Sequence, residues 1–185
     1  MSYNMSSVDT DTSTSDTVLC WATGQHNVNV RNKTEWEAFQ TLLNEVCIEM
    51  AKLVVRDGEG ATKLIEVTIN GAPTVKEARA IAKSVIDSPL VKTAIYGNDP
   101  NWGRLLMAAG KPDTRLNPDK LSVFIGDHVL YQDGDAVEFD HEAIVAVLKK
   151  DPVNITFELN IGSATATAWG CDLTERYIEI NTDYN

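Results

Sequence analysis

The clearest pattern of hydrophobic positions in the chain runs from residue 33 to residue 56. Apolar residues recur there at steps of three and four, which is the period of a helix with one apolar face. These apolar positions are Trp36, Phe39, Leu43, Val46, Met50 and Leu53. Asn32 or Thr34 can cap the start of the helix, and the two glycines of DGEG (57–60) end it. The pattern predicts one long amphipathic helix followed by a tight turn.

Shorter apolar stretches between turn-forming residues predict strands before and after this helix. The expected strands are TVLCWATG (17–24), KLIEVTING (63–71), LVKTAIYG (90–97), KLSVFIG (120–126), HVLYQDG (128–134), VNITFELNIG (153–162) and a segment that begins with SATATAWG (163–170). The fourth and fifth form a predicted β-hairpin, with a second turn at Asp133 and Gly134. The apolar stretch LLMAAG (105–110) is ambiguous, and residues 25–32 have the composition of a turn or loop.

Capping signals predict two further helices. TVKE (74–77) has the form of a capping box. The helix that it begins ends at the Ser-Pro pair 88–89, because proline disfavours the helical conformation of the residue before it. DHEAIVAVLKK (140–150) predicts a short helix capped by Asp140. LTERYIEIN (173–181) fits a strand through its alternating isoleucines, or a helix with a threonine cap.

The order of these elements indicates the α/β class in the broad sense that includes α+β. Most of the expected strands alternate apolar and polar residues. This favours mixed, largely antiparallel sheets with packed helices over a doubly wound parallel sheet. Regular alternation of strands and helices starts where the long helix ends. We therefore expect residues 1–63 to hold the first strand and the long helix, and residues 64–185 to form a C-terminal α/β domain.

Composition and charge indicate a folded, acidic protein and count against some kinds of binding partner. The 185 residues are 43% hydrophobic, enough for a folded core, and their formal net charge is −11. Binding to nucleic acid or to an anionic membrane surface needs clustered lysine and arginine, so we expect neither partner. No apolar stretch is long enough to span a membrane, and the N-terminus has no feature of a secretory signal.

The cysteines and histidines give no signature of a metal site or of a local nucleophile. They are Cys20, Cys47, Cys171, His26, His128 and His141. The cysteines are odd in number, widely spaced and without a C-x-x-C pair, so neither structural zinc nor a disulfide framework is expected. This usage fits a reducing compartment, and we expect a cytoplasmic protein.

The polar stretch VDTDTSTSDT (8–17) has part of the pattern of a calcium loop. Asp9, Asp11 and Ser13 occupy its first, third and fifth positions. The sixth and twelfth positions hold threonine and cysteine instead of the required glycine and glutamate, so calcium is not expected. A disordered polar tail is the simplest interpretation of residues 1–7. We interpret the side chains of 8–17 as hydrogen-bond partners of the backbone in a tight loop.

Two glycine-containing loops are candidate binding sites. In RDGEGATK (56–63), Glu59 either faces a substrate ammonium group or is a solvated acid at a helix stop. GNDPNWGR (97–104) lacks the glycine spacing of a phosphate loop, so it is either a turn anchored by Trp102 or a binding loop. The residues alone therefore define no complete catalytic set.

Four stretches in series resemble the C-terminal (β) chain of the ornithine acetyltransferase family, the bifunctional glutamate N-acetyltransferases of arginine biosynthesis. They are DTDTSTSDT (9–17), VRDGEGATKLIEV (55–67), SPLVKTAIYGNDPNWGR (88–104) and ATAWGCDLTERYIEINTDY (166–184). The resemblance runs in order from about Ser2 to Asn185. It implies the self-cleaving αββα fold shared by DmpA and ornithine acetyltransferase.

The resemblance also implies an activity. The family's precursor cleaves itself into α and β chains, and the new N-terminal threonine of the β chain is the nucleophile. Acetyl passes from N-acetylornithine to glutamate through an acetyl-threonine intermediate, giving ornithine and N-acetylglutamate. The α chain supplies the oxyanion donors and is the expected partner, in a heterodimer that assembles as a heterotetramer. Neither a metal nor an organic cofactor is implied.

Two residues match substrate-binding positions of the family. Glu59 matches a glutamate that pairs with a substrate amine, and Asn181 matches an asparagine whose amide holds a substrate carboxylate. The nucleophilic threonine is expected upstream of Met1, so no catalytic residue is expected in this chain. Thr10 stands where many bifunctional members have glycine, which favours the ornithine-dependent members that use acetyl-CoA poorly as donor.

We therefore expect an incomplete enzyme that is inactive alone: a truncated form, a fragmentary gene product or one piece of a split protein. One alternative is a non-catalytic binding or assembly fragment of the same fold. Another is an aminopeptidase of the related self-cleaving fold, against which the motifs DGEGATK (57–63) and WGCDLT (169–174) count.

Overall fold

A six-stranded sheet forms the centre of the computed structural model, which describes residues 2–26 and 30–183. Its strand order is β4-β3-β2-β5-β1-β6. The strands are β1 (Leu64–Ala72), β2 (Ser122–Ile125), β3 (His128–Gln132), β4 (Asp135–Ala136), β5 (Val153–Glu158) and β6 (Ala164–Cys171). β1 and β5 are parallel, and the other neighbouring pairs are antiparallel. The expected mixed, largely antiparallel sheet is confirmed.

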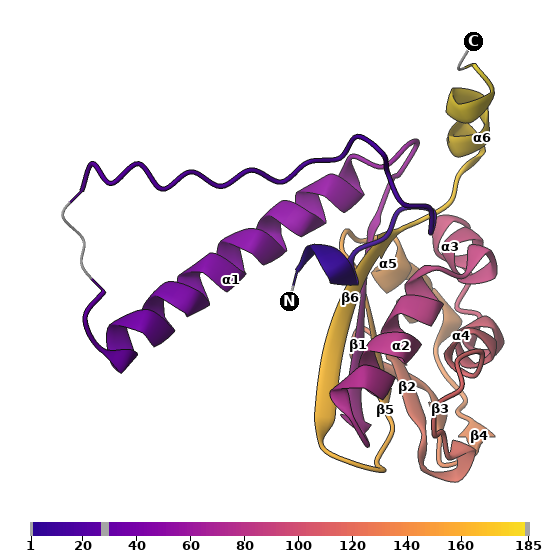
Figure 1. Ribbon diagram of the computed structural model, residues 1–185. Helices are drawn as coiled ribbons and strands as arrows, with labels where there is room; N and C mark the ends of the chain where they lie inside the picture. Colours follow the sequence, from indigo (N-terminus) through magenta and orange to yellow (C-terminus); the bar gives the residue numbers. More distant parts are fainter. Residues whose placement is uncertain (1, 27–29, 184–185) are drawn as a thin grey trace.

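Helices cover one face of this sheet, and one long helix leaves it as an arm (Figure 1). The helices are α1 (Lys33–Arg56), α2 (Val75–Ile86), α3 (Pro89–Tyr96), α4 (Trp102–Ala109), α5 (His141–Leu148) and α6 (Glu175–Thr182), with short 3-10 turns η1 (Tyr3–Met5) and η2 (Pro118–Lys120). α2 lies on the sheet beside α3 and α4, whereas α1 is the arm and α6 projects at the end of the chain (Figure 1).

The core lies between the sheet and α2. Ile65, Val67 and Ile69 alternate along β1, and all three are fully buried. Ile81 and Val85 of α2 are also fully buried and belong to the same cluster. Side chains of a strand point alternately to its two faces, so this alternation fixes which face of β1 packs on the helices.

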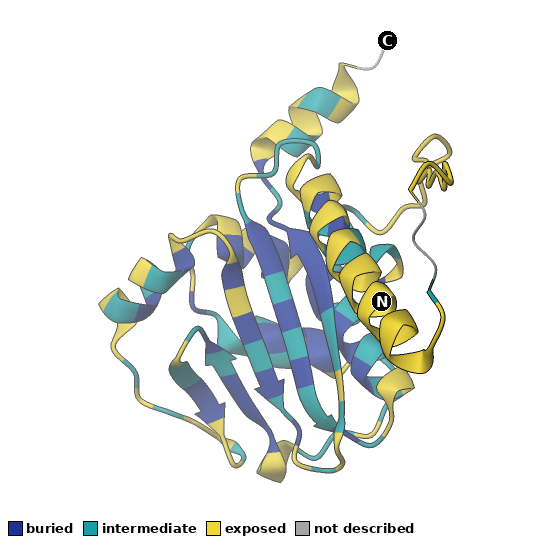
Figure 2. Ribbon diagram, turned by 90° about the vertical axis from the view of Figure 1, so that its left-hand side faces the viewer, coloured by how far each residue is buried: buried dark blue, intermediate teal, exposed yellow. Residues whose placement is uncertain are grey.

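The opposite face of β1 is polar and is hydrogen-bonded from strand to strand. Glu66 accepts a 2.8 Å bond from the indole nitrogen of Trp169, and Asn70 donates a 2.7 Å bond to Glu158. Thr68 lies between them on the same face. These half-buried groups are paired, which is the usual requirement for polar side chains removed from water. Figure 2 shows this face with its bands of buried and half-buried residues.

The long predicted helix is confirmed as α1, and its start is capped as expected. The side chain of Asn32 accepts a 3.0 Å hydrogen bond from the Glu35 backbone. Its buried residues are Ala51 and Val55, near its C-terminal end. Most of its length is exposed (Figure 2). Within the part of the chain that the structure describes, the apolar stripe that defines α1 in the sequence is therefore largely uncovered.

The capping box, the hairpin and the helix after Asp140 are also confirmed. Thr74 accepts a bond from the Glu77 backbone at the start of α2, and Asp140 caps α5 at 3.1 Å. β2 and β3 pair as an antiparallel hairpin. The second turn has Asp133 at φ 51° and Gly134 at φ 95°, as the tight turn between β3 and β4 requires.

The expected strand at residues 17–24 is wrong. These residues are exposed and have no regular secondary structure. Val18, Leu19 and Trp21 expose 62%, 64% and 77% of their surface. A strand needs a neighbouring strand to satisfy its backbone groups, and none of the strands described here pairs with this segment. The turn expected at 25–32 falls in part outside the described residues.

The expected strand at residues 90–97 is also wrong, because this segment is helix α3. Pro89 occupies the first turn, where its missing N–H costs nothing. Val91 and Ile95 are buried at helical spacing, while Leu90 is exposed. The ambiguous residues 105–110 belong largely to α4, and LTERYIEIN forms α6.

Candidate functional site

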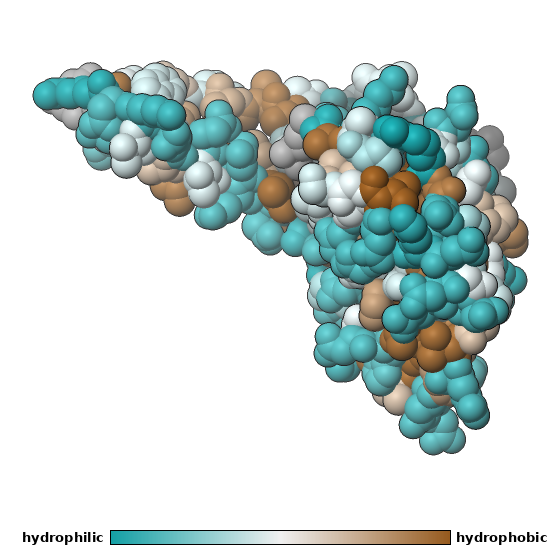
Figure 3. Space-filling view, turned by 90° about the horizontal axis from the view of Figure 1, so that it is seen from below, coloured by the Kyte–Doolittle hydropathy of each residue, from teal (hydrophilic) through white to brown (hydrophobic). Residues whose placement is uncertain are grey.

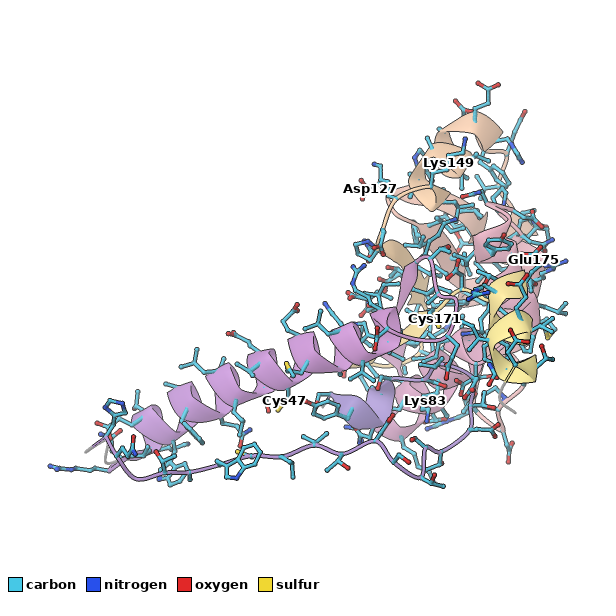
Figure 4. All side chains as sticks on the ribbon, turned by 90° about the horizontal axis from the view of Figure 1, so that it is seen from above. Cys47, Lys83, Asp127, Lys149, Cys171 and Glu175 are labelled. Atoms are coloured by element: carbon cyan, nitrogen blue, oxygen red, sulfur yellow. The ribbon has the colours of Figure 1, made fainter. Side chains whose placement is uncertain are left out.

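Three segments that are far apart in the sequence meet where β6 ends. They are the loop 57–63 after α1, residues 6–11 near the N-terminus, and the start of α6. Figure 4 labels Cys171, the last residue of β6, and Glu175, the first residue of α6. We call this junction the β6–α6 junction.

Asp172 fixes the loop 57–63 at this junction. Its side chain is buried, and its carboxylate accepts bonds from the backbone of Thr62 at 2.8 Å and of Lys63 at 3.0 Å. The Thr62 hydroxyl also donates to it. Burial lowers the pKa of Lys63, and the nearby Asp172 charge opposes that shift. A buried carboxylate with several donors is well compensated, so it holds the loop in one conformation.

Lys92 ties the N-terminal segment to the end of β6. This lysine of α3 is 3% exposed. Its Nζ donates to the carbonyl oxygen of Val8 at 2.5 Å and to that of Cys171 at 2.6 Å. Burial raises the pKa of the Cys171 thiol, and the Lys92 charge partly opposes this. A buried ammonium group with two carbonyl acceptors joins three separate segments of the chain.

The N-terminal residues are packed rather than free, so the interpretation of residues 1–7 as a tail is wrong for the described residues 2–7. Met5 is 3% exposed and belongs to the main core. The backbone of Ser7 donates a 3.0 Å bond to the carbonyl of Trp169. The buried Met5 side chain and the hydrogen bond from Ser7 hold this segment along β6.

The stretch 8–17 forms the side-chain-to-backbone hydrogen bonds expected of it. A carboxylate oxygen of Asp9 accepts from the Asp11 backbone at 3.1 Å, and the Ser13 hydroxyl accepts from the Asp16 backbone at 3.0 Å. Thr10 has φ 80°, a turn conformation that such local bonds support. The side chains of Asp9 and Ser13 therefore support the local structure of this segment.

Glu59 lies at the β6–α6 junction, close to Tyr177 of α6. The Tyr177 hydroxyl donates a 3.0 Å bond to a carboxylate oxygen of Asp9. Burial raises the pKa of Tyr177, and the charges of Asp9, Glu59 and Asp11 raise it further. The structure thus gathers three carboxylates around one phenol, which gives this point a negative potential suited to a cation.

Gly60 allows this close approach of the loop to α6. It has φ +68°, and a Cβ there would lie 2.8 Å from the Arg176 Cβ and 2.8 Å from the Tyr177 backbone nitrogen. The Thr174 hydroxyl donates a 2.8 Å bond to the Gly60 carbonyl. Glycine is the residue that fits both the conformation and the contact.

Asn181 lies one helical turn beyond Tyr177 and is exposed. Its side-chain nitrogen donates a 2.9 Å bond to the Tyr177 carbonyl. No hydrogen bond between the described residues joins Asn181 to Glu59. Glu59 therefore lies in the loop that packs on the start of α6, and Asn181 lies within α6. The structure does not join the two expected substrate residues by a hydrogen bond.

The loop 97–104 is a structured turn anchored by a tryptophan. The Trp102 ring stacks on Tyr131 with 5.7 Å between the ring centroids, and Asn101 caps α4. An open pocket of about 360 Å³ lies beside it, with Phe139 and His141 in its lining. Within residues 2–26 and 30–183, no group of three or more His, Cys, Asp or Glu side chains is placed to hold a metal ion.

Sequence reasoning missed Lys92, Asp172 and Tyr177. Each lies in a stretch that carries the family resemblance, and this was the one available signal. Their partners are between 79 and 168 residues away in the chain, so no local pattern reveals them.

One solved structure with a similar fold is that of a protein named for arginine biosynthesis. The crystal structure of arginine biosynthesis bifunctional protein argJ from Bacillus halodurans matches with a TM-score of 0.93 and 42% sequence identity. The match covers 99% of this chain and 87% of that chain. At this similarity the two share one fold.

Sequence comparisons agree with the structural one. Arginine biosynthesis bifunctional protein ArgJ of Oceanobacillus iheyensis is 49% identical over 185 residues, covering 99% of this chain and 46% of the relative. Glutamate N-acetyltransferase of Methanopyrus kandleri is 44% identical over 186 residues, covering 98% and 48%. The fold and these relatives place the chain in one class with proteins named for arginine biosynthesis or glutamate N-acetyltransfer. The ArgJ family model matches residues 1–185, and the chain belongs to the ArgJ family.

The chain spans less than half the length of the curated relatives that it matches. Among the described residues, no helix is both long and apolar enough to cross a membrane.

Proposed function

We propose that this chain is the β-chain portion of an acyltransferase that moves acetyl from N-acetylornithine to glutamate in arginine biosynthesis. The observation that carries the proposal is the match to the ArgJ family along all 185 residues. The acetyl group passes through an acetyl-threonine intermediate, which divides one difficult transfer into two easier steps. The products are ornithine and N-acetylglutamate.

The β6–α6 junction supplies the substrate-binding groups in this proposal. Glu59 pairs with the side-chain amine of N-acetylornithine, and the negative potential around Tyr177 supports that assignment. Asn181 binds the substrate carboxylate through its amide, for which it gives up its bond to the Tyr177 carbonyl. Asp9 and Asp172 hold the surrounding loops and take no part in the chemistry.

The nucleophile and the oxyanion donors lie outside these 185 residues in this proposal. The threonine hydroxyl attacks the acetyl carbonyl, and a base takes its proton and passes it to the α-nitrogen of ornithine, which leaves as an amine. The amine of glutamate then attacks the acetyl ester and releases the threonine. Donors from the α chain stabilise the negative oxygen formed in each step. The chain alone is therefore proposed to be inactive.

The exposed apolar stripe of α1 supports the α chain as partner. Trp36, Leu42, Val46 and Leu53 expose 57%, 62%, 59% and 58% of their surface, a large apolar area for a helix in water. Figure 3 shows hydrophobic residues along this projecting arm. We propose that the α chain covers the stripe in a heterodimer, which pairs into a heterotetramer. We also propose a cytoplasmic location, since Cys20, which is exposed, is a free thiol.

A second candidate is a non-catalytic assembly fragment of the same fold, and the same apolar stripe favours it. Co-expression with the upstream part of an ArgJ protein, which supplies both the α chain and the nucleophilic threonine, separates the two candidates. The purified complex is assayed for acetyl transfer from N-acetylornithine to glutamate, with acetyl-CoA as an alternative donor. The acyltransferase proposal expects transfer by the complex and none by this chain alone. A stable complex without transfer from either donor would support the assembly fragment instead.

A further inference from the structure

Helix α6 projects from the molecule and has little packing of its own (Figure 1). It has eight residues, and none of them is buried. Isolated helices of this length are not stable in water, because the few hydrogen bonds do not offset the cost of starting a helix. The direction of α6 must therefore be set by the contacts at its start.

Those contacts are few, and one of them reaches the N-terminal segment. The Thr174 hydroxyl holds the Gly60 carbonyl, and the Tyr96 hydroxyl is bonded to the Glu175 carboxylate, which raises the pKa of Tyr96. Both of these contacts lie at the first residues of the helix. Tyr177 is the third residue of the helix, and its hydroxyl reaches Asp9 at 3.0 Å. A helix held only at its cap and first residue can swing, whereas this bond from the side of the first turn to the N-terminal segment restrains its angle.

Asp9 is a rigid point of attachment. One of its carboxylate oxygens accepts the Tyr177 hydroxyl, and the other accepts the Asp11 backbone at 3.1 Å. The neighbouring Val8 carbonyl is bound by the buried Lys92 at 2.5 Å. The carboxylate is thus fixed from its own loop and from α3. A hydroxyl bound to a fixed, charged acceptor makes one of the stronger kinds of hydrogen bond in a protein.

The angle of α6 controls the position of Asn181. This residue lies four positions beyond Tyr177, about 6 Å further along the helix axis. Glu59 precedes Gly60, which packs directly on the Tyr177 backbone. A change in the angle therefore moves the Asn181 amide relative to the Glu59 carboxylate, while Glu59 stays with the start of the helix.

We infer that Tyr177 and Asp9 are positioning residues, whose hydrogen bond sets the span between Glu59 and Asn181 and so selects substrates by length. The inference rests on the proposed function, in which Glu59 binds the amine and Asn181 the carboxylate of N-acetylornithine. Neither positioning residue touches the reacting acetyl group. Their effect is on the binding of the two ends of the substrate, in the ground state and the transition state alike.

The test uses the complete enzyme, with this chain assembled on the upstream part of an ArgJ protein that supplies the α chain and the nucleophilic threonine. Tyr177→Phe removes the hydroxyl and keeps the ring, and Asp9→Asn neutralises the acceptor. Each variant is expected to raise KM for N-acetylornithine about 10-fold and to leave kcat within about twofold, the pattern of lost uniform binding. The double variant should be no worse than either single one, because all three lose the same charge-assisted bond.

A second readout separates positioning from a general loss of structure. Nα-acetyllysine is one methylene longer than N-acetylornithine. The ratio of kcat/KM for the shorter over the longer substrate should fall several-fold in Tyr177→Phe. Glu179→Gln is the matched control, since it breaks only the exposed Arg176–Glu179 pair on the same helix and should leave KM and the ratio unchanged.

Hydrogen exchange of the 185-residue chain gives a readout that is independent of activity. Amides of residues 178–182 should exchange faster in Tyr177→Phe than in the wild type or in Glu179→Gln. An active wild-type enzyme with unchanged KM, substrate ratio and exchange in Tyr177→Phe would overturn this inference and leave the proposed function intact. Absence of acetyl transfer by the wild-type complex would instead overturn the proposed function, and with it the substrate-length role.

Discussion

The hydroxyl of Thr174 donates a 2.8 Å hydrogen bond to the carbonyl of Gly60, and this bond joins the last helix of the chain to the loop that follows the first long one. The two residues are 114 positions apart in the sequence. Glu59 and Tyr177 lie on either side of the contact. The position of the proposed substrate residues therefore depends on how closely this loop approaches α6.

Replacing Gly60 by alanine should disrupt that approach. The added Cβ would meet the Tyr177 backbone nitrogen at 2.8 Å, and the positive φ of +68° is itself strained for alanine. We expect the free energy of unfolding to fall by about 2–3 kcal/mol. Urea unfolding monitored by circular dichroism measures this change.

Gly134→Ala is the matched control for this prediction. Gly134 lies in the turn between β3 and β4 with φ +95°, and a Cβ there would be in ordinary van der Waals contact, 3.4 Å from the Asp119 side chain. Both variants therefore place alanine at a positive φ in an ordered turn, and only Gly60→Ala adds the close contact with α6. Equal losses of stability in the two variants would show that the contact contributes nothing.

Replacing Lys92 by methionine should loosen the N-terminal segment. The substitution leaves the Val8 and Cys171 carbonyls without their donor in a buried setting, and the loss of a buried charge offsets part of that cost. We expect the free energy of unfolding to fall by about 2 kcal/mol. Limited proteolysis should also cut near residues 6–11 more rapidly. Lys149→Met, at an exposed lysine far from the junction (Figure 4), should match the wild type in both measurements.

Glu77 should make the thermal stability of the protein depend on pH in the acid range. Its bonds to Arg115 and then to Thr74 lower its pKa from 4.5 to about 2. A lowered pKa in the folded state means that the stabilisation is complete above the unfolded value, near 4.5, and is lost as the pH falls towards 2. The difference in Tm between wild type and Glu77→Gln should thus be constant from pH 5 to pH 7 and shrink between pH 4.5 and pH 2.

Arg115→Gln provides the second arm of that experiment, because Arg115 is the main cause of the shift. The difference in Tm between wild type and Arg115→Gln should shrink over the same pH range as the difference for Glu77→Gln. A Tm difference that persists unchanged down to pH 2 in either variant would contradict the assignment of the shift to this ion pair.

A charge placed on the apolar stripe of α1 should weaken assembly with the α chain. Trp36 is 57% exposed, so Trp36→Glu should change the stability of this chain little. Buried in an interface, a tryptophan is a frequent hot spot, and its loss typically costs about 2 kcal/mol or more, equal to about 30-fold in Kd. Ala38→Glu adds the same charge on the opposite side of the helix and should leave the Kd unchanged. Equal Kd values for both variants would place the interface elsewhere.

Several elements could be predicted from the sequence because their signals are local. The helix from Lys33 and the capping box at Thr74 follow from the spacing of apolar residues and from caps that bond within four positions. The two wrong strands, 17–24 and 90–97, are short apolar stretches. In such stretches periodicity does not separate strand from helix, and a strand forms only if a partner strand is present.

Less of the candidate site than of the fold could be predicted from the sequence. The glycine-flanked loop made Glu59 a candidate with two interpretations, and the family resemblance favoured substrate binding, whereas Asn181 was selected through the resemblance alone. Lys92, Asp172 and Tyr177 act through bonds to distant segments, so their importance depends on the topology. A polar residue within an apolar helix, as Lys92 is within α3, is the nearest thing to a local signal.

The most direct test of the central claim is acetyl transfer by the assembled enzyme with Glu59 intact or replaced by glutamine. Labelled acetyl is followed from N-acetylornithine to glutamate at varied donor concentrations. Loss of a charged pair with the substrate amine should raise KM for the donor by about 10- to 100-fold. Glu142→Gln, at the exposed start of α5, serves as the control. A wild-type complex that transfers acetyl, with Glu59→Gln showing the KM of the control, would contradict the assignment of this chain's junction as the substrate-binding side.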